Sequence, residues 1–314
     1  MTVAECAAYL SARDDFLIFT HTRPDGDTVG SAAALTRALR ALGKTAYVFD
    51  NTEVTARYRP LISDLIAPQG FAHGCAVTVD TASTQMFPDG AERFAARIDL
   101  AIDHHVSYGG YAGAAIVRPE CAACGDLMLE IIDALGVPLD ADIAAALYIA
   151  VATDTGCFSY DNTNAGAFYT ASRCAEAGAP IAEINRELFR SKSAGRVAIE
   201  GAVYSGMEFF FGGRAAFVTI TAAAQAAAGA TEDDMENIAA VPVSIDGVDV
   251  GVTFREMPGG ETKVSVRSSP AVSSNALAAA FGGGGHAAAA GFMSRKGLDV
   301  LRARMLELLA EVLR

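Results

Sequence analysis

Short apolar runs alternate with a helical segment in the first hundred residues, and no other feature constrains the fold as strongly. The runs Phe16–Thr20, Thr45–Phe49, Cys75–Asp80 and Ile98–Asp103 predict buried β-strands. Residues 30–42 carry apolar side chains at helical spacing and precede a glycine, which predicts a helix between the first two strands. Because strands alternating with helices are typical of parallel βαβ units, we expect an α/β fold with helices on both faces of a parallel sheet.

The pattern changes after residue 190, and the length of 314 residues also suggests two domains. We expect an N-terminal domain over residues 1–190, mostly helical from residue 125 onward, and a linker over residues 191–200. Residues 201–314 contain four further strand-like runs, glycine-rich turns and a terminal amphipathic helix. This part is expected to form a smaller, mixed α+β domain.

Charge and composition exclude some classes of protein. The chain has 24 Lys and Arg against 37 Asp and Glu, a formal charge of −13, so we do not expect it to bind long duplex nucleic acid through general charge. The most apolar window, residues 143–152, is far shorter than the ~20 residues that span a bilayer. Six irregularly spaced cysteines and the lack of a signal-peptide pattern favour a reducing cytoplasm and no membrane partner.

The motif HTRPDGDTVGS follows the first predicted strand and brings His21, Asp25 and Asp27 onto one loop. Imidazole and carboxylate groups at this spacing are ligands for a divalent ion of borderline hardness, such as Mn²⁺. The alternative is that Asp27 or Thr28 caps the next helix and that the PDG segment is merely a turn.

Three further motifs place ionisable residues where strands or helices end. Asp80 follows the third predicted strand, and the triplet Asp103-His104-His105 follows the fourth. Asp154 closes an apolar helix. Taken alone, Asp80 has a simpler interpretation as a helix cap and Asp154 as a solvated helix end. Packing, however, does not explain two adjacent histidines at the end of a strand.

Parallel strands present their carboxyl ends at one edge of a sheet, so these residues should converge. The predicted set is His21, Asp25, Asp27, Asp80, His104 and Asp154. Four carboxylates in one place are costly unless cations neutralise them. Two divalent ions about 3.5–4 Å apart would do so, and would lower the pKa of a bridging water enough to supply hydroxide. The pattern therefore predicts phosphoester hydrolysis.

These four motifs, together with FGGGGHAAAAGF near the C-terminus and the preceding VSVRSS, resemble the DHH phosphoesterase superfamily and its DHH-associated domain. By layout the chain is similar to the stand-alone nanoRNase/pAp phosphatases (NrnA type). The resemblance implies a manganese-dependent enzyme that converts short oligoribonucleotides or linear dinucleotides to mononucleotides, and 3′-phosphoadenosine 5′-phosphate (pAp) to AMP. It also implies a possible homodimer.

The resemblance further implies how the ligands are shared. One Mn²⁺ would be bound by residues matching His21, Asp25 and Asp80, and the second by those matching Asp27, Asp80, His104 and Asp154. Asp80 would bridge the two ions. Asp103 would orient a histidine ligand, and His105 would contact the scissile phosphate or assist the leaving group.

The C-terminal domain is expected to hold the rest of the substrate. Gly283, Gly284 and Gly285 would allow close approach of a phosphate or base, His286 would supply a donor, and Arg267 would anchor a terminal phosphate. A helix after these glycines would offer its N-terminus to an anion. The alternatives are a flexible turn between helices for the glycines and an ordinary surface charge for Arg267.

Two departures from the family pattern bear on substrate preference: Cys157 after DTG, and the segment ENIAAVPVSID before Gly247. The pair Cys121 and Cys124 forms a single CxxC motif, which alone favours neither zinc nor redox chemistry. The preferred substrate, the native metal and the oligomeric state stay open. Two other functions also stay open: an inorganic pyrophosphatase or polyphosphatase, and a nucleotide sensor without catalysis.

Overall fold

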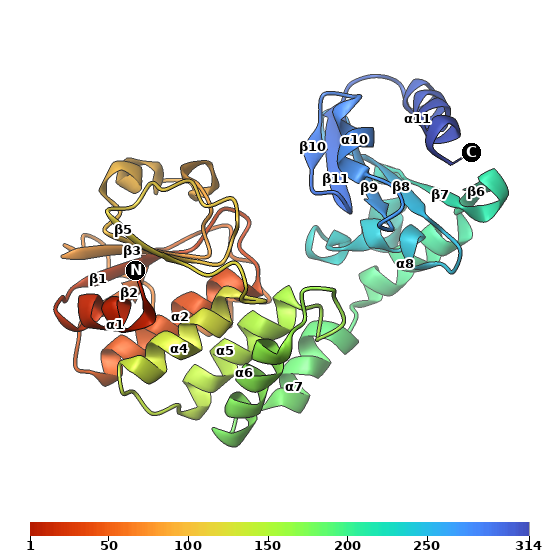
Figure 1. Ribbon diagram of the computed structural model, residues 1–314. Helices are drawn as coiled ribbons and strands as arrows, with labels where there is room; N and C mark the ends of the chain where they lie inside the picture. Colours follow the sequence, from red (N-terminus) through yellow and green to blue (C-terminus); the bar gives the residue numbers. More distant parts are fainter. Residues whose placement is uncertain (314) are drawn as a thin grey trace. The chain divides into compact units, whose positions relative to one another are not determined.

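The computed structural model describes residues 1–313, which form two compact units, Met1–Ser191 and a second unit from Lys192 onward (Figure 1). The first unit contains a five-stranded sheet in the order β2-β1-β3-β4-β5, and every pairing in it is parallel. Its strands are β1 (Phe16–Phe19), β2 (Ala46–Val48), β3 (Cys75–Val79), β4 (Leu100–Asp103) and β5 (Ala114–Val117). The predicted α/β class is confirmed, although β5 was not anticipated.

α-Helices cover one face of this sheet, and short 3₁₀ helices with their connecting loops cover the other. The helices are α1 (Val3–Ser11), α2 (Gly26–Ala41), α3 (Arg59–Ile62), α4 (Cys124–Ala134), α5 (Ala141–Asp154), α6 (Ala165–Glu176) and α7 (Ile181–Asn185). The apolar side chains of α1, α2, α4 and α5 bury the main core against Phe16, Ile18 and Val77. Leu17 and Phe19 face a second cluster, which includes Phe87 after the 3₁₀ helix η1 (Thr84–Met86) and Phe94 in the 3₁₀ helix η2 (Glu92–Arg97).

Helix α2 begins one turn earlier than the predicted helix over residues 30–42, because Asp25 caps it. The Asp25 carboxylate accepts hydrogen bonds from the backbone of Asp27 at 3.0 Å and of Thr28 at 3.2 Å. Two glycines then let α2 lie close to α5: a Cβ on Gly26 or Gly30 would fall 2.4 Å from α5 atoms. This close packing brings the first turn of α2 next to the C-terminal end of α5.

The second unit contains a mixed six-stranded sheet in the order β10-β11-β9-β8-β7-β6, in which only the β7–β8 pairing is parallel. Its strands are β6 (Glu208–Phe210), β7 (Ala215–Ile220), β8 (Val250–Glu256), β9 (Thr262–Ser268), β10 (Gly284–Gly285) and β11 (Ala289–Ser294). Its helices are α8 (Ala194–Ser205), α9 (Ala222–Ala228), α10 (Ser274–Ala279) and α11 (Leu298–Val312). Among residues 1–313, no helix is long and apolar enough to cross a membrane.

The two faces of this sheet bury different clusters. Leu277 of α10 and Leu301 and Met305 of α11 pack against one face. Ile199 of α8 packs on the other, together with the short turns that contain Ile238.

The structure shows the conformation of the predicted linker and of the residues that follow the glycine run. Most of the predicted linker over residues 191–200 is helical, because Ser193 caps α8 and Ile199 is fully buried. The expected helix after the glycine run is wrong: residues 289–294 form β11, which pairs along its whole length with β9. Burial of Ala290 and Phe292 on alternate positions outweighs the helix propensity of the alanines.

Candidate metal centre

The predicted ligands lie together at the carboxyl edge of the parallel sheet. His21 and Asp80 follow the neighbouring strands β1 and β3, and His104 follows β4. Asp27 lies in the first turn of α2, and Asp154 is the last residue of α5. These residues form three groups, and within each group the potential ligand atoms lie within 4.8 Å of one another. The groups are His21–Asp25–Asp80, Asp27–His104–Asp154 and Asp80–His104–His105. All six residues predicted as metal ligands are members of these groups.

Asp80 lies between two histidines and offers each of them a different oxygen. Its Oδ2 is 3.5 Å from Nε2 of His21, and its Oδ1 is 3.3 Å from Nε2 of His104. Oδ1 is buried, and ring nitrogens of both His104 and His105 lie near it, at 3.3 and 3.4 Å. The backbone of Asp80 has a φ of 53°, a left-handed conformation that costs energy in a residue other than glycine. A carboxylate held this way fits a position between two cations.

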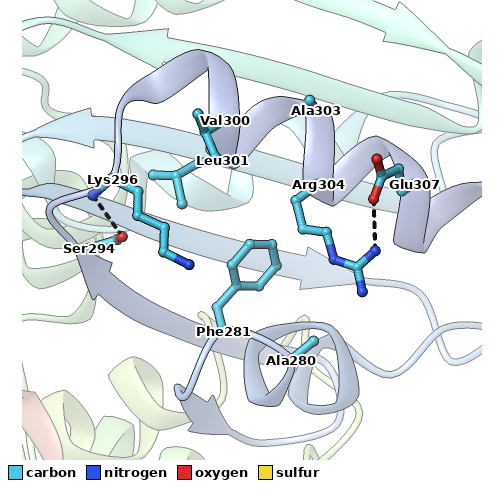
Figure 2. A pocket seen from close by; sticks show the side chains of 9 residues that line it. All are labelled: Ala280, Phe281, Ser294, Lys296, Val300, Leu301, Ala303, Arg304 and Glu307. Atoms are coloured by element: carbon cyan, nitrogen blue, oxygen red, sulfur yellow. Dashed lines mark hydrogen bonds and ion pairs between the residues drawn. The ribbon is translucent and has the colours of Figure 1, made fainter.

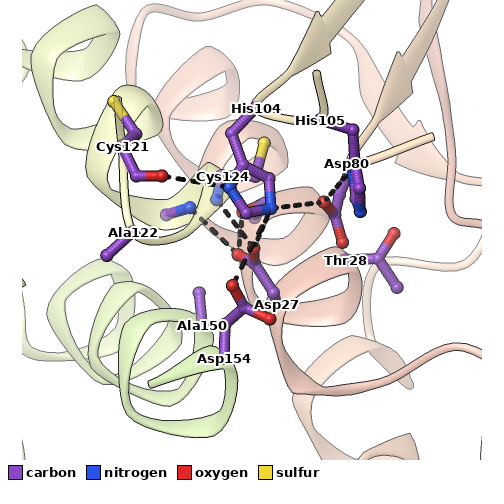
Figure 3. A network of polar contacts seen from close by, with 12 residues as sticks. Asp27, Thr28, Asp80, His104, His105, Cys121, Ala122, Cys124, Ala150 and Asp154 are labelled. Atoms are coloured by element: carbon purple, nitrogen blue, oxygen red, sulfur yellow. Dashed lines mark hydrogen bonds and ion pairs between the residues drawn. The ribbon is translucent and has the colours of Figure 1, made fainter. Parts of the chain in front are cut away.

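Both histidines are oriented by backbone carbonyl groups. Nδ1 of His21 lies 2.7 Å from the carbonyl oxygen of Thr22, and Nδ1 of His104 lies 3.2 Å from that of Cys121. Figure 3 shows the His104 ring, with one nitrogen toward Cys121 and the other toward the carboxylates. When Nδ1 donates its proton to a carbonyl, Nε2 is left as the ligand atom, the arrangement that metal-binding histidines commonly have.

The electrostatics of the cluster reflect the burial of several acids. Burial, with the charges of Asp80 and Asp154, raises the pKa of Asp27 well above its usual value. Burial also raises the pKa of Asp154, to about 7. Burial lowers the pKa of His104, but its hydrogen bond to Asp80 and the surrounding carboxylates outweigh this and raise it to about 10. The buried carboxyl groups thus favour positive charge close to them, either as bound protons or as a divalent cation.

Asp103 holds the two adjacent histidines in place through hydrogen bonds to its carboxylate. It is fully buried, and its Oδ1 accepts hydrogen bonds from the backbone N–H groups of His104 and His105, at 2.7 and 3.1 Å. The same oxygen lies 2.8 Å from Nδ1 of His105, and this hydrogen bond raises the pKa of that histidine. Asp103 therefore orients the ring of His105, whereas the His104 ring is oriented by the Cys121 carbonyl.

Sequence reasoning missed a second support, made of backbone groups in residues 121–125. The amides of Cys124 and Gly125 donate to the two oxygens of Asp27, at 2.7 and 3.0 Å. Asn162 donates to Asp154, at 3.1 Å to its carbonyl and 3.4 Å to its Oδ2. The CxxC motif marked this segment, but its contacts use main-chain atoms, which no residue type reveals. Cys121 and Cys124 form no disulfide.

In the second unit, Arg267 lies near the glycine hairpin. Arg267 on β9 pairs with Ala289, whose carbonyl accepts from the backbone of His286 at 2.8 Å. The glycines form a β-hairpin arm rather than a turn between helices, and a Cβ on Gly283 or Gly285 would lie within 2.5 Å of β11 atoms. A pocket of about 160 Å³ beside Arg267 is also lined by two further cations, Arg255 and Lys263.

A larger pocket of about 610 Å³ lies between α10, α11 and the end of β11 (Figure 2). Phe281 forms part of its wall and stacks on Phe292 with ring centroids 4.4 Å apart. Lys296 and the Arg304–Glu307 ion pair also line it. None of the residues predicted to bind substrate lines this pocket.

Comparison with known proteins defines the class. Residues 15–151 match the family model described as "DHH family, N-terminal domain", and residues 212–314 match the "DHHA1 domain". The chain belongs to the DHH family, and the resemblance seen in its motifs is confirmed.

The relatives are more specific. The chain is 35% identical, over 94% of its length and 89% of the relative's, to the "bifunctional oligoribonuclease and PAP phosphatase NrnA" of Thermus thermophilus. It is 25% identical to the "probable bifunctional oligoribonuclease and PAP phosphatase NrnA" of Streptococcus mutans, over 90% of this chain and 91% of that one. An exopolyphosphatase-related protein from Bacteroides fragilis shares the fold, with a TM-score of 0.86 and 24% identity over 99% of this chain and 97% of that one.

Proposed function

We propose that this hydrolase of phosphoester bonds is manganese-dependent and acts on short oligoribonucleotides and linear dinucleotides, which it converts to mononucleotides. We also propose that it converts pAp to AMP. The activities named for the Thermus thermophilus and Streptococcus mutans relatives, which align along nearly the whole chain, support this substrate class. A cytoplasmic location and a homodimer stay predictions of the sequence.

The observation that carries the proposal is the position of Asp80 between two groups of ligand atoms. We assign one Mn²⁺ to His21, Asp25 and Asp80, and the second to Asp27, Asp80, His104 and Asp154. The two oxygens of Asp80, each facing a different histidine, support its role as the bridge. A ligand set of imidazole nitrogens and carboxylate oxygens suits Mn²⁺, whereas Ca²⁺ is typically bound by oxygen atoms alone.

The chemistry follows from charge. Divalent ions bound at these residues would neutralise phosphoryl oxygens and lower the pKa of a water molecule, so that hydroxide forms at neutral pH. His105 is 36% exposed at its side chain, and its Nδ1 is engaged by Asp103. Its Nε2 is therefore the atom that we assign to the scissile phosphate or to proton donation to the leaving group.

The substrate is expected to be short. A protein with a formal charge of −13 does not attract a long phosphate backbone by its overall field, so the attraction has to be local. The pocket shared by Arg255, Lys263 and Arg267 supports a role for Arg267 in holding a terminal phosphate. We assign Gly283, Gly284, Gly285 and His286 to the nucleotide end next to it.

The test is a substrate panel with manganese and metal-stripped protein. We expect Mn²⁺ to stimulate release of mononucleotides from RNA of two to five nucleotides, and of phosphate from pAp, with pyrophosphate turned over poorly. Asp80→Asn should abolish both activities. Intact oligomers and pAp in the presence of Mn²⁺ would refute the proposal, and faster turnover of pyrophosphate would favour a pyrophosphatase.

Arg267 is tested in the same assay. Arg267→Ala should raise KM for the short RNA with little change in kcat, because it removes a contact to a part of the substrate that does not react. Lys296→Ala is the matched control, since Lys296 is a cation of the same unit that lines the other pocket (Figure 2). An equal effect of both substitutions would contradict the role of Arg267.

A further inference from the structure

A buried carboxylate lies behind the metal centre and belongs to none of the predicted motifs. Asp126, in the first turn of α4, is 6% exposed. Its Oδ2 accepts a hydrogen bond from the backbone of Ala122 at 3.1 Å, and its Oδ1 accepts one from the Thr170 hydroxyl at 2.6 Å. Both oxygens of this buried acid are therefore engaged, one by α6 and the other by the segment that precedes α4.

The Ala122 amide links Asp126 to a predicted metal ligand. This N–H and the carbonyl of Cys121 belong to the same peptide group, which is planar and turns as one body. The N–H points to Asp126, while the carbonyl lies 3.2 Å from Nδ1 of His104 (Figure 3). Asp126, one peptide group and the His104 ring thus form a continuous chain of hydrogen bonds.

The same segment also touches two other predicted ligands. The carbonyl of Ala122 accepts from Asn162 at 3.0 Å, and Asn162 also donates to Asp154. The amides of Cys124 and Gly125 hold Asp27. A displacement of this segment would therefore move several ligands together.

We propose that Asp126 is a positioning residue of the metal centre, which sets the direction of the His104 ring through the Cys121–Ala122 peptide group. This inference rests on the proposed function, because it takes His104 as a metal ligand. Its effect is analogous to that of a carboxylate bonded directly to a histidine ligand, which fixes the ring and makes it more basic. Here a peptide group stands between the two.

The proposed role requires no thiol chemistry from the CxxC motif in this segment. Burial raises the pKa of Cys121 to about 12, so its thiolate is scarce at neutral pH. The Cys124 side chain is fully buried, and burial raises its pKa as well. The segment acts through its main chain, and the two thiols pack against the surrounding core.

The experiment compares Mn²⁺ binding to metal-stripped protein by isothermal titration calorimetry, with the melting temperature of each metal-free variant measured in parallel. Asp126→Ala removes both hydrogen bonds. Asp126→Asn keeps an acceptor for the Ala122 amide and can donate to the Thr170 hydroxyl, so it retains the geometry without the charge. Thr170→Val removes one bond at nearly constant volume. Asp133→Ala is the control, because Asp133 joins α4 to Arg173 of α6 away from the segment.

We expect Asp126→Ala to weaken Mn²⁺ binding by about ten- to hundred-fold, the range typical of groups that orient a metal ligand. Asp126→Asn should restore binding to near the wild-type level, Thr170→Val should give a smaller loss, and Asp133→Ala should give none. The inference is overturned if folded Asp126→Ala protein binds Mn²⁺ like the wild type, or if Asp126→Asn binds as weakly as Asp126→Ala. If the wild-type protein binds no Mn²⁺, the proposed function itself fails.

Discussion

The backbone N–H of Cys124 donates a hydrogen bond of 2.7 Å to the carboxylate of Asp27, although 97 positions separate the two residues in the sequence. Ala123, at the N-cap of α4, has no side chain that could cap the helix, so Asp27 supplies that acceptor from α2. A helix N-terminus favours a negative charge and fixes its direction. The candidate metal centre is therefore partly formed by the contact between α2 and α4, two regular helices.

Gly125 tests the packing of α4 against the neighbouring helix α5. A Cβ at this position would lie 2.6 Å from Cβ of Ala150 on α5, so Gly125→Ala should push α4 away from α5 and lower the free energy of unfolding by about 1–3 kcal/mol. Gly201→Ala is the control, because no atom lies within 4 Å of its added Cβ and alanine favours the helix. Urea unfolding should show loss of stability for the first substitution and a gain for the second. Equal stability of the two variants would contradict the packing account.

Asn162 tests the support of Asp154. Asn162→Ala removes the donors that hold the Asp154 carboxylate and the Ala122 carbonyl, so Mn²⁺ binding should weaken by about tenfold or more. Asn164→Ala, two positions later, removes hydrogen bonds to Glu120 and Ala167, neither of which is a predicted ligand. It should lower the melting temperature and leave Mn²⁺ affinity unchanged. Loss of affinity in both variants would show that the loop has only a general structural role.

Glu200 provides a test by pH. Burial raises the pKa of Glu200, but hydrogen bonds from Lys192 and Arg196, at 2.6 Å each, outweigh burial and lower it below its usual value. The stabilisation is therefore present above the unfolded-state pKa of about 4.3 and is lost as the pH falls through the lower, folded-state pKa. Glu200→Gln should cost about 1–2 kcal/mol at pH 7, with the difference from the wild type disappearing in acid.

The matched control for that experiment is Glu307→Gln, whose partner Arg304 is exposed and whose loss should cost less than about 1 kcal/mol. Urea unfolding of the three proteins between pH 3 and pH 7 provides the measurement. A difference between Glu200→Gln and wild type that stays constant over this range would argue against the ion-pair explanation.

The proximity of the predicted ligands could be foreseen from the sequence because the position of a strand end is a local property. An apolar run that stops at His21, Asp80 or Asp103 places that side chain at the sheet edge, whatever the rest of the chain does. The close spacing of imidazole and carboxylate groups in the HTRPDGD motif then indicates a divalent ion such as Mn²⁺. The start of α2 was placed one turn late, because Asp25 as a helix cap and Asp25 as a candidate ligand look alike in the sequence.

Tertiary contacts account for what was missed. Residues 287–290 are alanines with high helix propensity, yet pairing with β9 makes Ala289 and Ala290 part of a strand. Burial of Ile199 likewise stabilises α8, which includes most of the predicted linker over residues 191–200. The support from residues 121–125 depends on main-chain groups, and main-chain groups are the same in every residue type.

The proposed role of Asp80 as the residue that joins two metal ions is best tested by counting the Mn²⁺ ions bound per chain by wild-type and Asp80→Asn protein. Equilibrium dialysis with metal analysis, starting from stripped protein, gives this number without relying on turnover. We expect two ions for the wild type, fewer than one for Asp80→Asn at the same free Mn²⁺, and an unchanged fold of the variant by circular dichroism. Equal binding by the two proteins, or no binding by the wild type, would contradict it.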